Sequence, residues 1–269
     1  MAVEPAAVEE ALFQIRFREL SREALERMAA AGQEVMEIRR RLARTGDNIV
    51  GELIKGEDTF YEWNHYPDGD VYDAETGSQF FYHAHPADVR FGEHGHFHTF
   101  LRPAGMAPDM NPAAVPDLAL PEGPNDALSH LIGISMDRYG EPICLFTTNR
   151  WVTGEVWYDG ADVVRMLDRF AVGHTQPSWP VNRWITAMLR LFRPQIAALV
   201  AARDDAVAAW KVRRASRMGR HSVYEDRALE ITSYRRIAVE DQIRAVEGAL
   251  AASRGGGVSG AGPAAISGS

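Results

Sequence analysis

The sequence predicts an α+β fold in which helices precede and follow an antiparallel β-sheet of about five strands. Apolar residues recur at helical spacing in residues 1–46 and again in 161–253, whereas residues 58–160 are rich in Tyr, Phe, Trp, Val, Ile and Thr broken by turn residues. No helical segment is expected between the strands, which favours antiparallel pairing and the α+β class. We expect residues 1–253 to form a single domain and the Gly-, Ser- and Ala-rich residues 254–269 to be a disordered tail.

Two helices are predicted in the N-terminal region. The first has Pro5 in its first turn and a short apolar face. The second has Ser21 as its N-cap and ends at Thr45-Gly46-Asp47, where Gly46 suits the left-handed residue that follows a helix. Apolar or small residues recur between these ends at Leu25, Met28, Gly32, Val35, Ile38 and Leu42.

The β-rich region is read as a meander joined by short turns. Strands are expected near residues 79–85, 94–102, 129–137, 142–149 and 151–158. Tyr139-Gly140 predicts a tight turn between the third and fourth strands, and Pro67-Asp68-Gly69-Asp70 predicts a turn before the first. Residues 103–127 contain six prolines and are expected to form a long loop, a feature that is often functional or mobile.

The C-terminal region is predicted to contain four helical segments. One opens at Asp159-Gly160, a second follows Pro180, a third spans 195–214 after Pro194, and the last spans 224–252. The apolar stripe of the last helix consists of Val239, Ile243, Val246 and Leu250. We expect this C-terminal helix to pair across a two-fold axis if the protein is a homo-oligomer.

Composition narrows the classes of function. A chain of 269 residues that is 46% hydrophobic and 25% charged can bury a core, and its net charge of −8 argues against a nucleic-acid partner. No apolar run reaches about 18 residues, so no membrane span is expected. Met1-Ala2-Val3-Glu4-Pro5 lacks the basic and apolar segments of a secretory signal, and Cys144 has no second cysteine to pair with. We therefore expect a cytoplasmic protein.

Histidine is concentrated in the predicted sheet. Seven of the nine histidines lie between residues 65 and 130, and five lie within the sixteen residues from 83 to 98. Side chains two residues apart in a strand share a face. His83 and His85 are therefore expected to point one way, and the same holds within the set His94, His96 and His98.

The hairpin register decides whether these two sets of imidazoles meet. Paired residues in an antiparallel hairpin have numbers that sum to a constant, and an odd sum puts both sets on one face. Pairing His83 with His96 and His85 with His94 satisfies this condition, and so does the slipped pairing of His83 with His98 and His85 with His96. Facing imidazoles are then close enough to share a metal ion.

A third strand is expected to add His130, on the face of Leu128, Ile132 and Ile134. The candidate metal ligands are His83, His85, His94, His96, His98 and His130. Imidazole ligation suits Fe, Cu or Zn, and we favour Fe slightly. The alternative reading is a solvated surface patch, but neighbouring imidazolium charges repel, and a metal relieves that cost by binding the neutral rings.

Catalytic helpers are sought among nearby polar residues. Tyr82 adjoins the cluster, and Glu155 could serve as a fourth ligand, as a partner of an imidazole or as a base. The competing reading of Glu155 is a solvent-facing residue on an edge strand. Glu93 adjoins the cluster too, but in a regular strand it would point to the face opposite His94.

The segment His96-Phe97-His98 resembles the first half of the cupin metal motif. That motif continues with a Glu a few residues on, whereas Thr99-Phe100-Leu101-Arg102 follow here without a carboxylate. The resemblance covers only these few residues, so neither the cupin fold nor an activity is carried over from it.

Three functions remain open from the sequence. The first is a mononuclear metalloenzyme, such as a non-haem iron oxygenase acting on a small molecule, with the Pro-rich loop as a lid. The second is a non-catalytic protein that binds or senses a metal or haem, because the histidines outnumber the ligands that one ion needs. The third is a helical scaffold or oligomerisation protein.

Overall fold

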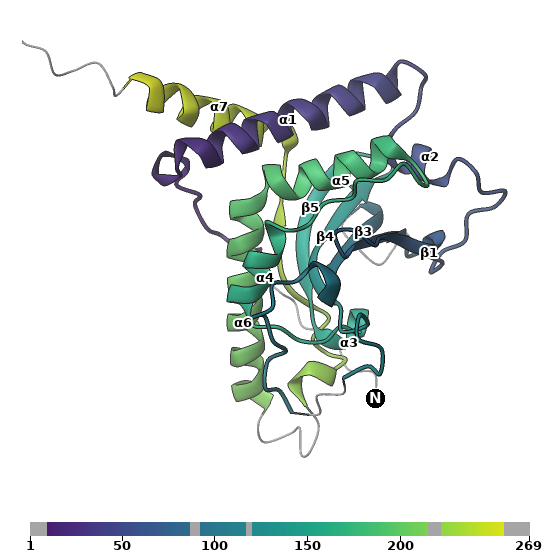
Figure 1. Ribbon diagram of the computed structural model, residues 1–269, viewed down its shortest axis with the longest axis vertical. Helices are drawn as coiled ribbons and strands as arrows, with labels where there is room; N and C mark the ends of the chain where they lie inside the picture. The colour runs from purple at the N-terminus through teal and green to yellow at the C-terminus, as the bar shows by residue number, and fades with distance from the viewer. Residues whose placement is uncertain (1–9, 87–91, 117–119, 215–221, 256–269) are drawn as a thin grey trace, which may run out of the picture.

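The computed structural model describes residues 10–86, 92–116, 120–214 and 222–255, and it has the predicted α+β architecture (Figure 1). Its helices are α1 (Arg22–Ala43), α2 (Ile49–Ile54), α3 (Arg150–Thr153), α4 (Gly160–Leu167), α5 (Trp179–Leu191), α6 (Arg193–Arg214) and α7 (Val239–Gly255). Short 3₁₀ turns occur at Phe17–Glu19, Pro103–Gly105 and Val223–Glu225. Its strands are β1 (Tyr66–Asp73), β2 (Ser78–His83), β3 (Glu93–Leu101), β4 (Ser129–Asp137), β5 (Pro142–Thr148) and β6 (Ile231–Arg236).

The described strands form one antiparallel sheet whose spatial order follows the chain, β1-β2-β3-β4-β5-β6. The sheet therefore has six strands where the sequence predicted about five. Four of the predicted strands correspond to β2, β3, β4 and β5. Gly140, with φ of 77°, makes the predicted turn between β4 and β5.

The predicted strand at 151–158 is wrong. The Asn149 side chain accepts a hydrogen bond from the Arg150 N–H, and the chain then forms the short helix α3. Gly154, with φ of 65°, ends this helix in the left-handed conformation, which glycine adopts at little cost. Residues 155–159 follow without regular structure.

The two outer strands, β1 and β6, were not predicted. The Pro67–Asp70 segment lies inside β1, where the pairing with β2 shifts between Tyr66 and Val71. These turn-forming residues produce a local irregularity in the strand, where φ is 79° at Gly69 and 60° at Asp70. At the other edge, β6 occupies part of the predicted 224–252 helix, and α7 begins only at Val239.

One face of the sheet packs against helices. Tyr82 and Phe97 point to this face from β2 and β3, and both are fully buried. The ring of Trp184 from α5 lies 5.8 Å from that of Phe97. Figure 1 shows α4 and α6 running along one side of the sheet and α5 crossing near one end of it. This apolar layer is the main core of the molecule.

The long helices α1 and α7 pack against each other across one end of the molecule (Figure 1). A Cβ atom on Gly32 of α1 would lie 2.8 Å from Ile243 Cγ1, so glycine permits the close approach of the two helices. Val246 and Leu250 of the predicted stripe are buried against Leu25 and Met28. This part of the stripe is thus used within the chain, and oligomerisation through the C-terminal helix stays a prediction.

The chain ends lie largely outside the described residues. The predicted helix that begins at Pro5 is not formed over residues 10–16, where the chain has no regular structure, and its earlier part falls on residues 1–9. The predicted tail falls mostly on residues 256–269. Within the described part of the chain no single helix is both long and apolar enough to cross a membrane, and α5 with α6 reaches that length only across a bend of 72°.

Candidate metal site

The second face of the sheet carries the histidine cluster. In the β2–β3 pair His83 lies opposite His96, which is the first of the two predicted registers. Phe81 lies opposite His98 in the same ladder. Since facing residues of antiparallel strands share a face, these four side chains lie on the side away from Tyr82 and Phe97.

Three of the histidines form a compact triad: His83, His85 and His96. Each offers one ring nitrogen, and these nitrogens all lie within 4.8 Å of one another. The Nε2 atoms of His83 and His96 are 2.7 Å apart. His85 lies two residues beyond the end of β2, and its ring is stacked 5.0 Å from that of His96. Three imidazoles converging in this way could hold a transition-metal ion.

A carboxylate orients one member of the triad. Glu93 Oε1 lies 2.7 Å from His96 Nδ1, and the two side chains are only 5% and 1% exposed. This contact makes Nδ1 the hydrogen-bond donor and leaves the Nε2 lone pair directed at His83. Metal-binding histidines commonly have such a carboxylate partner, which fixes the ring and raises its basicity.

An irregularity in the pairing of β3 with β4 keeps His94 away from the triad. The β3–β4 pairing shifts between Glu93 and Gly95, which turns His94 to the helix-covered side and corrects the expectation that it shares the face of His96. There, His94 Nδ1 lies 2.7 Å from the Tyr82 hydroxyl. A Cβ atom on Gly95 would lie 2.5 Å from the His83 carbonyl oxygen, so glycine is needed where the strand bulges.

A second shift brings His130 onto the histidine face. Thr99 pairs with Ile132, but Phe100 pairs with His130, so one extra residue is inserted in β4. This corrects the expectation that His130 shares the face of Ile132. His130 Nε2 lies 3.0 Å from His98 Nδ1. Burial, aided by the charge of Arg203, lowers the pKa of His130 to about 3, which keeps its ring neutral.

Phe146 of β5 forms an aromatic wall beside the triad. Its ring lies 5.1 Å from the His96 ring and 5.7 Å from the His98 ring. A Cβ atom on Gly133 would lie 2.3 Å from the Phe146 ring, so glycine at this β4 position makes room for the ring of its partner on β5. The cluster is thus bounded by apolar surface on this side.

The sheet and the triad lie within a region that matches a known protein family. A family model described as Domain of unknown function (DUF6969) matches residues 29–237. The chain belongs to this family. The matched part includes all six strands of the sheet and all three residues of the triad. No curated protein and no solved structure matches the chain.

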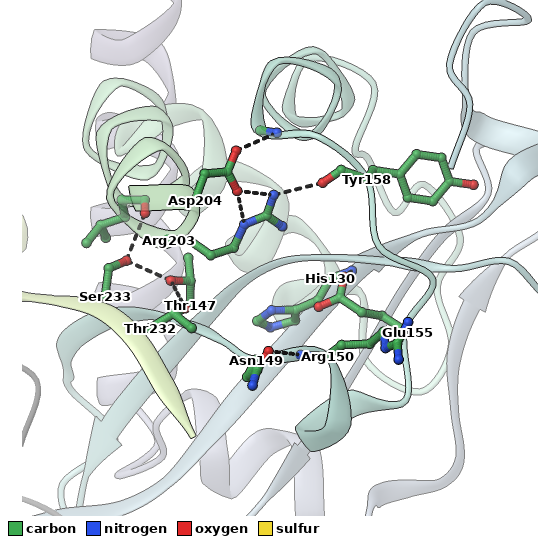
Figure 2. A network of polar contacts seen from close by, with 12 residues as sticks. His130, Thr147, Asn149, Arg150, Glu155, Tyr158, Arg203, Asp204, Thr232 and Ser233 are labelled. Atoms are coloured by element: carbon green, nitrogen blue, oxygen red, sulfur yellow. Dashed lines mark hydrogen bonds and ion pairs between the residues drawn. The ribbon is translucent and has the colours of Figure 1, made fainter. Parts of the chain in front are cut away.

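Outside the triad, Glu155 occupies a buried polar network at the far end of the histidine row (Figure 2). Its Oε2 accepts a 2.7 Å hydrogen bond from the backbone N–H of His130. Burial raises the pKa of Glu155 to about 7, and the charge of Arg203 opposes that rise. Arg203 itself donates to the Tyr158 carbonyl oxygen at 2.8 Å. Among the described contacts, Glu155 is connected to the triad through His130 and His98.

Tyr82 lies on the opposite face from the triad. Burial raises the pKa of its hydroxyl, which keeps the group protonated. The predicted ligands thus divide into three groups: the triad, the pair His98 and His130, and His94 on the other face. In the described parts of the Pro-rich loop, Met106 and Met110 are packed into the core and the only regular structure is a 3₁₀ turn.

Sequence reasoning missed the part that Glu93 plays. The expectation that Glu93 and His94 point to opposite faces is correct, but the bulge reverses which of them meets the triad. Trp63 and His65, which pack against the cluster, come from the loop and turn before β1. The Trp63 ring lies 4.3 Å from that of His85, and the His65 ring is stacked 3.6 Å from that of Phe81. No periodic pattern links that loop to the strands.

Proposed function

We propose that His83, His85 and His96 bind one transition-metal ion, and that the protein is a mononuclear metalloenzyme. The observation that carries the proposal is the convergence of three ring nitrogens within 4.8 Å, with Glu93 on the outer nitrogen of His96. Three protein ligands leave coordination positions for water or substrate, which is the arrangement of catalytic rather than structural sites.

The donor set narrows the identity of the ion. Three neutral imidazoles suit Zn, Cu or Fe, and they disfavour Mg or Ca, which prefer oxygen ligands. Glu93 lies outside the ligand set because its carboxylate is engaged by His96 Nδ1. An iron-dependent oxygenase acting on a small molecule, with a cytoplasmic location, remains our preferred prediction.

A non-catalytic metal- or haem-binding protein is the second candidate. The observation that favours it is the additional pair of His98 and His130, whose nitrogens lie 3.0 Å apart beside the triad. The His96 and His98 rings are 4.7 Å apart, so the two groups are in contact. Such a protein would gain stability on loading, or show a Soret band, without turning over any substrate.

Elemental analysis of untagged protein tests the proposal. After separate loading with Fe(II), Cu(II) and Zn(II), we expect about one bound ion per chain for at least one of these metals. His96→Ala should lose that ion. His94→Ala is the matched control, because His94 lies two residues away on the same strand but on the other face. Failure of every metal to bind the parent protein would overturn the proposal.

A further inference from the structure

A large cleft lies along β1, beside the side chains that cover the triad. It has a volume of about 1090 Å³ and is lined by the loop before β1, by β1 itself and by side chains from β2 and the end of the Pro-rich loop. Trp63 and His65 form the boundary between this cleft and the triad. Trp63 is packed against His85, and the His65 ring lies 5.7 Å from that of His83. A molecule in the cleft would therefore contact the side chains that cover two of the three ligands.

The cleft presents unusually exposed aromatic rings. Tyr61 and Trp63 are each 59% exposed, and Tyr72 is 37% exposed. Large aromatic side chains left in contact with solvent around a concave surface are characteristic of ligand-binding sites. The Arg102 guanidinium lies over the Tyr72 ring, 5.5 Å from its centroid, so Tyr61 and Trp63 are the rings left for stacking or for contact with a cationic group.

The charge of the cleft is predominantly negative. Four carboxylates line it, and one guanidinium opposes them: the carboxylates are Glu57, Asp68, Asp70 and Asp126, and the guanidinium is Arg102. Arg102 is already engaged by Asp126 at 3.1 Å and by Gln79 at 2.6 Å. It is therefore poorly placed to recognise an anionic ligand. A cleft of one sign concentrates ligands of the opposite charge.

Two of the carboxylates are left for a ligand. Asp70 is held by His65 at 2.9 Å and by Gln79 at 2.7 Å. Glu57 and Asp68, in contrast, are exposed and form no ion pair with other residues in the described parts of the chain. An incoming cation would meet their charge without first breaking an existing pair.

The backbone holds Trp63 in a conformation that it does not favour. Trp63 has φ of 73° and Asp70 has φ of 60°, and both residues line the cleft. A bulky aromatic residue at positive φ is an outlier, and such outliers are concentrated at functional sites. The Trp63 N–H donates to the Ala84 carbonyl oxygen at 2.9 Å, which anchors the backbone here, and the indole contacts His85 at an interplanar angle of 74°.

We propose that this cleft binds an organic cation, an ammonium group held against the face of Trp63 and near the carboxylates of Glu57 and Asp68. As the assignment of a substrate class, this inference rests on the proposed metal function. As a binding site, it depends only on the cleft. An uncharged ligand such as a sugar could stack on the same rings, but it would leave the excess negative charge uncompensated.

Calorimetric titration of metal-free protein with choline tests this assignment, with 3,3-dimethylbutan-1-ol as the uncharged analogue of the same shape. We expect choline to bind at least about tenfold more tightly than the alcohol, and added salt to weaken its binding. Trp63→Ala should reduce choline affinity by about tenfold or more. Trp179→Ala is the matched control, since Trp179 is half exposed on α5 and does not line the cleft.

The outcomes separate this inference from the metal proposal. Equal binding of choline and the alcohol, absence of choline binding, or full affinity in Trp63→Ala would overturn the assignment of a cationic ligand. His96→Ala should keep its choline affinity, because its side chain does not line the cleft. A parent protein that binds choline but no metal would contradict only the metalloenzyme, and a parent protein that binds metal but no choline would contradict only the cleft.

Discussion

The two faces of the central sheet are built from the same strands but differ in chemistry. On the helix-covered face, Phe97 and Ile134 are paired across β3 and β4 and are fully buried in the core. On the other face, His96 and His98 alternate with them along β3. Because side chains alternate between the faces of a strand, the residues that stabilise the sheet are separate from the imidazoles. The packed face thus anchors the backbone that holds the imidazoles.

Truncating a side chain on the helix-covered face should reduce the stability of the fold most. Phe97→Ala would remove a fully buried ring that contacts Trp184, so we expect a loss of about 3–5 kcal/mol in the free energy of unfolding. Urea denaturation of the metal-free protein measures it. The folded fraction should still bind metal. A loss below about 1 kcal/mol would mean that this face does not anchor the sheet.

On the histidine face, His96→Ala should reduce metal affinity far more than it reduces the stability of the fold. We expect metal affinity to fall more than about 100-fold, because the variant loses a ligand and the contact through which Glu93 acts. Urea denaturation of the metal-free variant should still show a folded protein, with a smaller loss of stability than in Phe97→Ala. His94→Ala on the same strand should retain parental metal affinity, and equal losses in both variants would contradict the assignment of the two faces.

Glu93→Gln tests the outer contact of the triad. Gln keeps the size of the side chain but removes the charge that holds His96 Nδ1 as a donor, so metal affinity should fall about 10- to 100-fold. Competition with a chelator of known affinity measures this change. An unchanged affinity would show that Glu93 serves only the fold.

Glu155→Gln should change the pH dependence of stability. The pKa of Glu155 rises from its ordinary 4.5 to about 7 in the folded chain, so the unfolded chain loses the proton first as pH rises. Ionisation of this residue therefore lowers the stability of the folded state progressively as pH rises from 4.5 to 7, and the full loss persists above pH 7. The Gln variant should gain about 1 kcal/mol or more over the parent at pH 8, with about 3 kcal/mol as the ceiling. Urea denaturation of metal-free protein at pH 5 and pH 8 measures this, and an identical pH profile would contradict the assigned pKa.

Much of the sheet could be predicted because local signals agree with the tertiary structure. The strands at Ser129–Asp137 and Pro142–Thr148 are short, largely apolar runs with β-branched residues, and they lie on either side of a turn at Gly140. Helix α1 was equally clear from its Ser21 cap, which accepts from the Ala24 N–H, and from its apolar spacing. These elements carry their own boundaries in the sequence.

The missed elements lack such agreement. In β1, Gly69 and Asp70 are turn-forming residues that the sheet accommodates as an irregularity, and no local pattern distinguishes this from a loop. In β6, Ile231 and Thr232 favour a strand, but they lie just before a long helical stripe that dominated the prediction. Pairing with β5 across a long stretch of chain decides the outcome.

The candidate site was predictable to the extent that side chains alternate regularly between the two faces of a strand. An odd-sum register required His83 and His96 to share a face, and the observed pairing has that register. The bulges at His94 and near His130 were not predictable from alternation, because they depend on close approaches such as that of Gly95 to the His83 carbonyl. The sequence therefore indicated where the imidazoles gather but not which of them meet.

X-ray absorption spectroscopy on the metal-loaded protein tests whether the three imidazoles share one ion. We expect three imidazole nitrogens at about 2.0–2.1 Å from a zinc ion or an ion of similar size. In His94→Ala this signature should be unchanged, and in His96→Ala any ion that still binds should have two imidazoles. A parent spectrum dominated by oxygen ligands, or the same three-imidazole spectrum in His96→Ala, would contradict the triad formed by His83, His85 and His96.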